Sequence, residues 1–186
     1  AAIICLLCPT CRPDEKPPLR LPAAYDDVSY YENTPTELEL LAQLTNLASE
    51  ARRSRTAEAY ISAKDLQQHY LEGAPALVEY STPYYASKTI GPNGWMVQIA
   101  NASGHIWQPG TTTGVGGYYG GYLFNDQGLA LEPMLVRGQL GAVLYRHFTD
   151  LIRQPVSLKT VDQMLAIYGA TPDFPNTYTN KFYAVH

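Results

Sequence analysis

Two histidine–carboxylate pairs have the residue types and the spacing to do chemistry. His69 and Glu72 are three residues apart, and so are His147 and Asp150, in segments where helices are predicted. Residues three apart on a helix share a face, so each pair could supply part of a site for iron or another divalent metal, although a catalytic zinc takes three protein ligands. The four residues together define a hypothetical cross-helix metal site. Surface ion pairs and helix-end charges explain the same residues without a metal, and we favour this simpler interpretation.

The glycine-rich stretch at residues 114–121 has the composition of a phosphate-binding loop. No Lys-Ser/Thr pair follows its last glycine, so the phosphate-loop motif is incomplete. A flexible contact loop is the better interpretation, and aromatic residues outside the loop could join it as anchors for a partner or a glycan. The candidate contact residues are Tyr84, Tyr85, Trp95, Trp107, Tyr118 and Tyr119. Packing against the helices explains the same residues equally well.

The three cysteines lie within the first eleven residues, at positions 5, 8 and 11. An iron–sulfur cluster would need a fourth cysteine, which the sequence lacks. A dithiol redox pair would need a strand–helix context, which the segment Cys8-Pro9-Thr10-Cys11 does not have. An apolar start followed by a charged, proline-rich segment is typical of a signal peptide that meets a tether. We therefore expect residues 1–11 to be a signal-peptide remnant with Cys11 as the lipidated residue, and residues 12–24 to be an extended tether.

The composition excludes some classes of protein and favours others. The chain of 186 residues is 46% hydrophobic and 16% charged, which allows one domain with a real core. A net charge of -4 leaves no basic footprint for nucleic acid. Arg52, Arg53 and Arg55 are expected to complement a helix end. Because no complete catalytic motif is found, we expect neither an enzyme nor a resident cofactor.

Four helices are predicted from apolar spacing and capping residues. The first covers residues 34–53, with Thr34 and Glu37 as a capping box and Pro35 at the first helical position. The second covers 62–73, and a short extended segment is expected before the first helix, at 25–31. The third covers 133–153 and contains Gly138 and Gly141, which predict close approach of another helix.

The fourth predicted helix covers 157–169, with apolar residues at Val161, Leu165 and Tyr168. Between the second and third helices, residues 73–128 are interrupted by prolines and glycines, and we expect a long irregular excursion there. The predicted fold is mainly α: a helical bundle with a long irregular Gly/Pro/Tyr-rich excursion.

Five stretches, in order along the chain, resemble a family of uncharacterised bacterial lipoproteins with an imelysin-like helical fold. They are Tyr-Asp-Asp-Val-Ser-Tyr at 25–30, Ile-Ser-Ala-Lys-Asp-Leu at 61–66, Tyr-Leu-Phe-Asn-Asp-Gln-Gly at 122–128, Arg-Gly-Gln-Leu-Gly-Ala-Val at 137–143 and Asp-Phe-Pro at 173–175. The resemblance implies an exported, lipid-anchored protein on the periplasmic or cell-surface side of the outer membrane.

The resemblance covers only the N-terminal half of such proteins, so residues 25–186 are expected to form an incomplete helical domain. The imelysin signature Gly-x-His-x-x-Glu is absent. The most similar segment begins at Gly104 and His105, but it has the wrong spacing and no carboxylate. A metallopeptidase activity is therefore not carried over. The expected function is that of a binding or accessory subunit, in an outer-membrane uptake complex or beside a chain that completes the bundle. Iron or other metal handling is the alternative.

Overall fold

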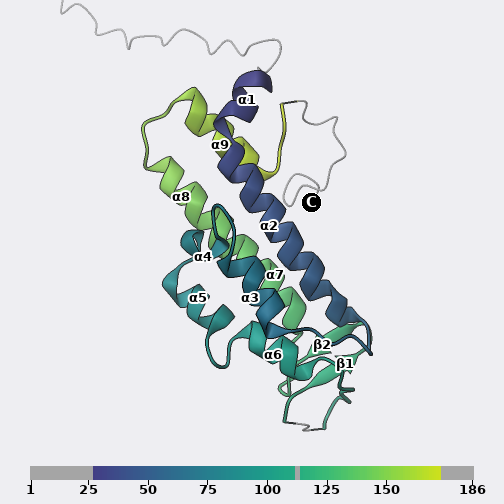
Figure 1. Cartoon of the computed structure of the whole chain (residues 1–186). Coiled ribbons are helices and arrows are strands. Elements are labelled where there is room, and N and C mark those ends of the chain that lie inside the picture. Colours follow the sequence, from purple (N-terminus) through teal and green to yellow (C-terminus); the bar gives the residue numbers. More distant parts are fainter. Residues whose placement is uncertain (1–26, 112–113, 173–186) are drawn as a thin grey trace, which may run out of the picture.

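The computed structural model describes residues 27–111 and 114–172, and within them the fold is mainly α, as predicted (Figure 1). The helices are α1 (Asp27–Asn33), α2 (Pro35–Arg52), α3 (Ala63–Leu71), α4 (Leu77–Tyr80), α5 (Pro83–Ile90), α6 (Trp95–Ala102), α7 (Leu131–Gln139), α8 (Arg146–Ile152) and α9 (Leu158–Tyr168). A 3-10 turn, η1 (Arg53–Arg55), follows α2, and a π-helical segment, η2 (Leu140–Tyr145), joins α7 to α8. The strands β1 (Gly117–Tyr119) and β2 (Tyr122–Phe124) form an antiparallel hairpin. Among these described helices, none is long and apolar enough to cross a membrane.

Helix α2 is the central element of the fold, and it packs against α3, α7 and α9. It runs between two ends of the molecule, with α1 and α9 at one end and the hairpin at the other (Figure 1). Its leucines Leu40, Leu44 and Leu47 are fully buried, together with Leu66 of α3 and Leu135 of α7. The helical spacing of these leucines gives α2 the apolar face around which the other helices gather.

The start of α2 differs from the prediction. Thr34 makes no capping bond, and its hydroxyl donates instead to the carbonyl oxygen of Tyr30 at 2.7 Å. Glu37 is buried rather than turned back to the helix start. The capping box was therefore wrong, because the chain arrives from another helix: from Asp27 onward, the segment expected to be extended is α1.

The prediction of an irregular excursion at 73–128 was also wrong for much of its length. The helices α4, α5 and α6 and the hairpin all lie within it. Local signals explain the breaks between them: Thr82 caps α5 by accepting a hydrogen bond from the amide of Tyr85, and Pro83 opens that helix. The prolines and glycines separate short elements here rather than prevent them.

The third predicted helix is confirmed, although it is not uniformly α-helical. The chain is continuously helical from Leu131 to Ile152, with the π segment η2 in the middle. A β-carbon at Gly138 would lie 2.1 Å from the hydroxyl oxygen of Tyr85, so this glycine does permit a close approach by a residue of α5. Nothing lies within 4 Å of the same position at Gly141, and there the prediction of a close approach was wrong.

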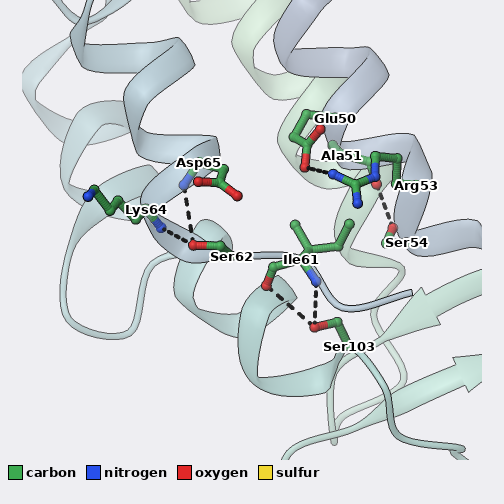
Figure 2. A network of polar contacts seen from close by, with 9 residues as sticks. All are labelled: Glu50, Ala51, Arg53, Ser54, Ile61, Ser62, Lys64, Asp65 and Ser103. Atoms are coloured by element: carbon green, nitrogen blue, oxygen red, sulfur yellow. Dashed lines mark hydrogen bonds and ion pairs between the residues drawn. The ribbon is translucent and has the colours of Figure 1, made fainter. Parts of the chain in front are cut away.

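Hydroxyl groups hold the connection from α2 to α3 (Figure 2). The backbone amide of Ile61 donates to the hydroxyl of Ser103, 3.1 Å away at the end of α6. The next residue, Ser62, caps α3 by accepting from the amides of Lys64 and Asp65. A long connection is thus fixed at the point where the second predicted helix begins.

Candidate functional site

The structure does not bring the four predicted metal residues together. His69 lies on α3, and the exposed Glu72 is its C-terminal cap. Asp150 forms exposed ion pairs with Arg146 and Arg153, at 3.8 and 3.4 Å. Within residues 27–111 and 114–172, no group of three or more His, Cys, Asp or Glu side chains could hold a metal ion.

His147 instead contacts the carboxylate of Glu37, which the sequence pattern had assigned to a capping box with Thr34. Its Nε2 lies 2.7 Å from Oε1 of Glu37, whose side chain is completely buried. The amide nitrogen of Gln163 donates to the same oxygen at 3.0 Å. These contacts join α2, α8 and α9 at one point, and no local signal in the sequence could have found them because the residues are far apart along the chain.

An aromatic ring packs against the histidine of this pair. The ring of Tyr80 meets that of His147 edge-on, with 4.8 Å between the centroids. Burial raises the pKa of the Tyr80 hydroxyl, and the charges of Glu37 and Glu79 raise it further. A histidine oriented by a carboxylate is half of a nucleophile-activating arrangement, but it meets no serine or cysteine in any contact recorded for the described residues. We interpret the pair as a clamp between helices.

Two of the predicted contact residues, Tyr85 and Trp95, pack against each other. Their rings meet at 5.1 Å between centroids, and Trp95 also packs on the main core. Tyr85 fills the space above Gly138. Tyr84, the neighbouring residue, is exposed, and the ammonium group of Lys88 lies over its ring. Internal packing therefore explains Tyr85 and Trp95, as the alternative interpretation supposed.

The other predicted contact residues gather at the β1–β2 hairpin. The register pairs Tyr119 with Tyr122 and Tyr118 with Leu123. Leu123 is buried and Tyr118 packs against the core, whereas Tyr119 and Tyr122 are exposed. Side chains alternate between the two faces of a strand, so the hairpin turns one face to the core and leaves the other outside.

On the outer face the aromatic side chains form a connected set. Trp107 stacks on Phe124 at 5.1 Å and meets Tyr119 edge-on at 6.2 Å. Phe124 in turn contacts Tyr122, and the guanidinium of Arg55 lies over the Tyr122 ring at 5.1 Å. We call these five residues (Arg55, Trp107, Tyr119, Tyr122 and Phe124) the hairpin face. Trp107 is the buried floor of this face, and Tyr119 and Tyr122 are 49% and 40% exposed.

Glycines allow the segments beneath the hairpin face to approach each other. A β-carbon at Gly116 would lie 2.1 Å from the carbonyl oxygen of Phe124, and one at Gly117 would lie 2.7 Å from that of His105. Both glycines have positive φ angles, 87° and 156°. The glycine-rich stretch thus forms part of a packed hairpin rather than a strand–turn–helix phosphate site.

Arg55 is held in place by a buried carboxylate. Glu132, at the start of α7, accepts from Nε and Nη2 of Arg55 at 3.2 and 3.0 Å, and Nε of Arg52 lies 3.7 Å from its other oxygen. Two of the three arginines expected to complement a helix end, Arg52 and Arg55, therefore anchor the end of α2 to α7, whereas Arg53 pairs with Glu50. Glu132, Tyr122 and Phe124 were not among the predicted contact or metal residues. The alternation Tyr122-Leu123-Phe124 was the available signal for a two-faced strand.

Comparison with known proteins gave no match: no family model, no curated protein and no solved structure is similar to this chain at a significant level. The predicted lipidation residue, Cys11, and the proposed tether lie outside the described residues.

Proposed function

We propose that this protein is a non-catalytic binding subunit that contacts a partner protein through its hairpin face. One observation carries the proposal: two exposed tyrosines are held in fixed positions by a tryptophan, a phenylalanine and an arginine that contact them. Tyr, Trp and Arg dominate the binding energy of protein interfaces, where they act as rigid anchors. A rigid anchor loses little conformational entropy on binding.

The test replaces Tyr119 by the photo-crosslinking residue p-benzoylphenylalanine in the full-length protein, in its native host. Tyr145 is the matched control, because it is an exposed tyrosine on the helical part of the chain, outside the hairpin. We expect a specific crosslinked product from position 119 that is missing from position 145, and that is lost when Tyr122 is also changed to alanine. Equal crosslinking at both positions, or none at either, contradicts the proposal.

We further propose that the subunit is exported and held at the outer membrane by a lipid on Cys11. The support is the apolar start of the chain, the proline-rich segment that follows Cys11, and the ordered resemblance to imelysin-like lipoproteins. Multiple acyl chains on one cysteine anchor a protein firmly. Intact-mass measurement of the native protein should show the added acyl mass, and Cys11→Ser should release the protein from the membrane fraction. Unchanged membrane association and unmodified mass would refute this anchoring.

A further inference from the structure

The connection between α8 and α9 presents apolar side chains to solvent. Every residue from Ile152 to Lys159 is exposed, and we call residues 152–159 the α8–α9 loop. Three of its side chains are large and apolar. Ile152 is 58% exposed and Leu158 57%, and Val156, at 89%, is the most exposed large apolar side chain of the residues that the structure describes. Apolar groups that gather on a protein surface mark a contact site, because burying them on a partner removes them from water.

Hydrogen bonds hold the loop in this exposed shape. Ser157 and Thr160 form the capping box that starts α9. The hydroxyl of Thr160 also donates to the carbonyl oxygen of Pro155 at 3.3 Å. At the other end of the loop, the amide of Gln154 donates at 3.0 Å to the carbonyl oxygen of the buried Leu151. The apolar side chains are therefore presented by a preformed turn, which loses little conformational entropy on binding.

Positive charge accompanies these apolar side chains. The loop contains Arg153 and Lys159 and no acidic residue, although the whole chain has a net charge of -4. Arg153 pairs with Asp150 at 3.4 Å, but both side chains are well exposed, and such pairs are weak. Cations beside exposed apolar groups complement an anionic lipid surface, where the apolar groups enter the acyl boundary and the cations stay at the phosphates. A protein partner fits less well, because lysine is depleted at protein interfaces.

The loop lies at the end of the molecule where the proposed anchor attaches. In Figure 1 the connection between α8 and α9 is at the same end as α1, which begins at Asp27. The segment proposed as a tether, residues 12–24, comes just before α1 in the sequence. A lipid on Cys11 would therefore hold this end towards a bilayer. The hairpin face lies at the opposite end (Figure 1), where it stays accessible to a partner protein.

We propose that the α8–α9 loop inserts Val156, Ile152 and Leu158 into the surface of an anionic lipid bilayer. Arg153 and Lys159 contact the lipid phosphates at the edge of the inserted side chains. The binding is reversible, because it depends on a small apolar area and on attraction to anionic headgroups. It rests on the proposed function only in that the lipid anchor brings this end of the protein to the membrane.

The first test is flotation of the purified full chain with vesicles of equal parts phosphatidylcholine and phosphatidylglycerol. Cys11→Ser is present throughout, so that no acyl chain contributes and the loop is tested separately from the anchor. We expect Val156→Glu to lower the vesicle affinity by at least about tenfold. Arg153→Gln combined with Lys159→Gln should lower it by about tenfold or more. Ile106→Glu is the matched control, since Ile106 is 60% exposed and lies beside β1, and it should bind like the parent chain.

The second test is fluorescence of Val156→Trp with lipids that carry bromine on their acyl chains, because bromine quenches a tryptophan that enters the bilayer. Ile106→Trp is the control, and the native Trp95 and Trp107 give both variants the same background. We expect quenching of the added tryptophan at position 156 and none at position 106. Circular dichroism checks that each variant is folded.

Four results would overturn the proposal. They are equal vesicle affinities of Val156→Glu and Ile106→Glu, an unquenched tryptophan in Val156→Trp, and undiminished binding to vesicles of phosphatidylcholine alone. The fourth is self-association without vesicles that Val156→Glu abolishes, which would assign the loop to a second copy of the chain. Failure of the anchor proposal has a different signature, because it appears as an unmodified mass and an unchanged membrane fraction of the native protein.

Discussion

Nε2 of His147 lies 2.7 Å from Oε1 of the completely buried Glu37, and this contact bridges 110 residues of sequence. It connects α8 to the first turn of α2, and Gln163 of α9 donates to the same oxygen. Three helices thus share one buried carboxylate. A buried acid loses much of its hydration and is tolerated only when its partners compensate for that loss.

Removing the histidine should therefore cost more than removing the charge of the acid. His147→Ala leaves the hydrogen bond from Gln163 to the buried carboxylate but removes the contact with the imidazole, and we expect a loss of about 3 kcal/mol in the free energy of unfolding. Glu37→Gln keeps the shape and should cost about 1 kcal/mol. Chemical denaturation of both variants and of the double variant gives the coupling energy. We expect the loss of stability in the double variant to be smaller than the sum of the two single losses. Strict additivity would contradict the clamp.

The stability of the protein should depend on pH through Asp162. Burial raises the pKa of this carboxyl group above its ordinary value of 3.8. A raised pKa in the folded state stabilises the fold below the unfolded-state value, and this stabilisation is lost as pH rises through the folded-state pKa. Asp162→Asn keeps an oxygen that can accept from Asn33, 2.7 Å away, but removes the titration. Its stability relative to the wild type, measured from urea midpoints, should rise as pH increases above about 4, and a constant difference would rule out this origin.

Gly138 and Gly141 form a matched pair of helical glycines with opposite surroundings. Alanine in a helix is about 1 kcal/mol more favourable than glycine. Since nothing lies within 4 Å of a β-carbon at position 141, Gly141→Ala should raise the melting temperature. Gly138→Ala should lower it, because the new methyl group must displace the ring of Tyr85, which Trp95 holds in place. Thermal melts of the two variants are sufficient, and a gain at both positions would show that Tyr85 moves freely.

Ser103→Ala should destabilise the fold more than removal of an exposed serine hydroxyl. The hydroxyl of Ser103 is the acceptor for the buried amide of Ile61, and its loss leaves that amide unpaired, at a cost of about 1–3 kcal/mol. Ser87→Ala is the control, because the hydroxyl of Ser87 makes only an exposed bond to the carbonyl of Tyr84. Both variants can be compared in urea unfolding experiments. Equal losses for the two serines would mean that the pairing of Ile61 with Ser103 contributes little.

Local sequence signals succeeded for the helices that carry a clear apolar stripe. The apolar spacing in 34–53 and 133–153 predicted helices that the structure confirms. Local residues also fix both ends of α9. Ser157 and Thr160 cap its start, and Gly169 adopts the left-handed conformation after its last turn. The failures came where two local interpretations competed. Thr34 and Glu37 have the spacing of a capping box, but the helix that precedes them occupies the place where such a cap would form.

The amino-acid sequence alone determined the helices predicted at 34–53, 62–73, 133–153 and 157–169, since helix formation there depends on residues three or four apart and on capping groups beside them. Only the tertiary structure decided which side of each element is buried, because that depends on contacts between distant segments. It turned Glu37 towards His147, placed Trp107 beneath Tyr119, and left the apolar side of α9 with Val161 and Tyr168 exposed. Burial of apolar surface favours the aromatic contact, and polar partners compensate for the lost hydration of the Glu37 carboxylate; no local spacing specifies the partner in either case.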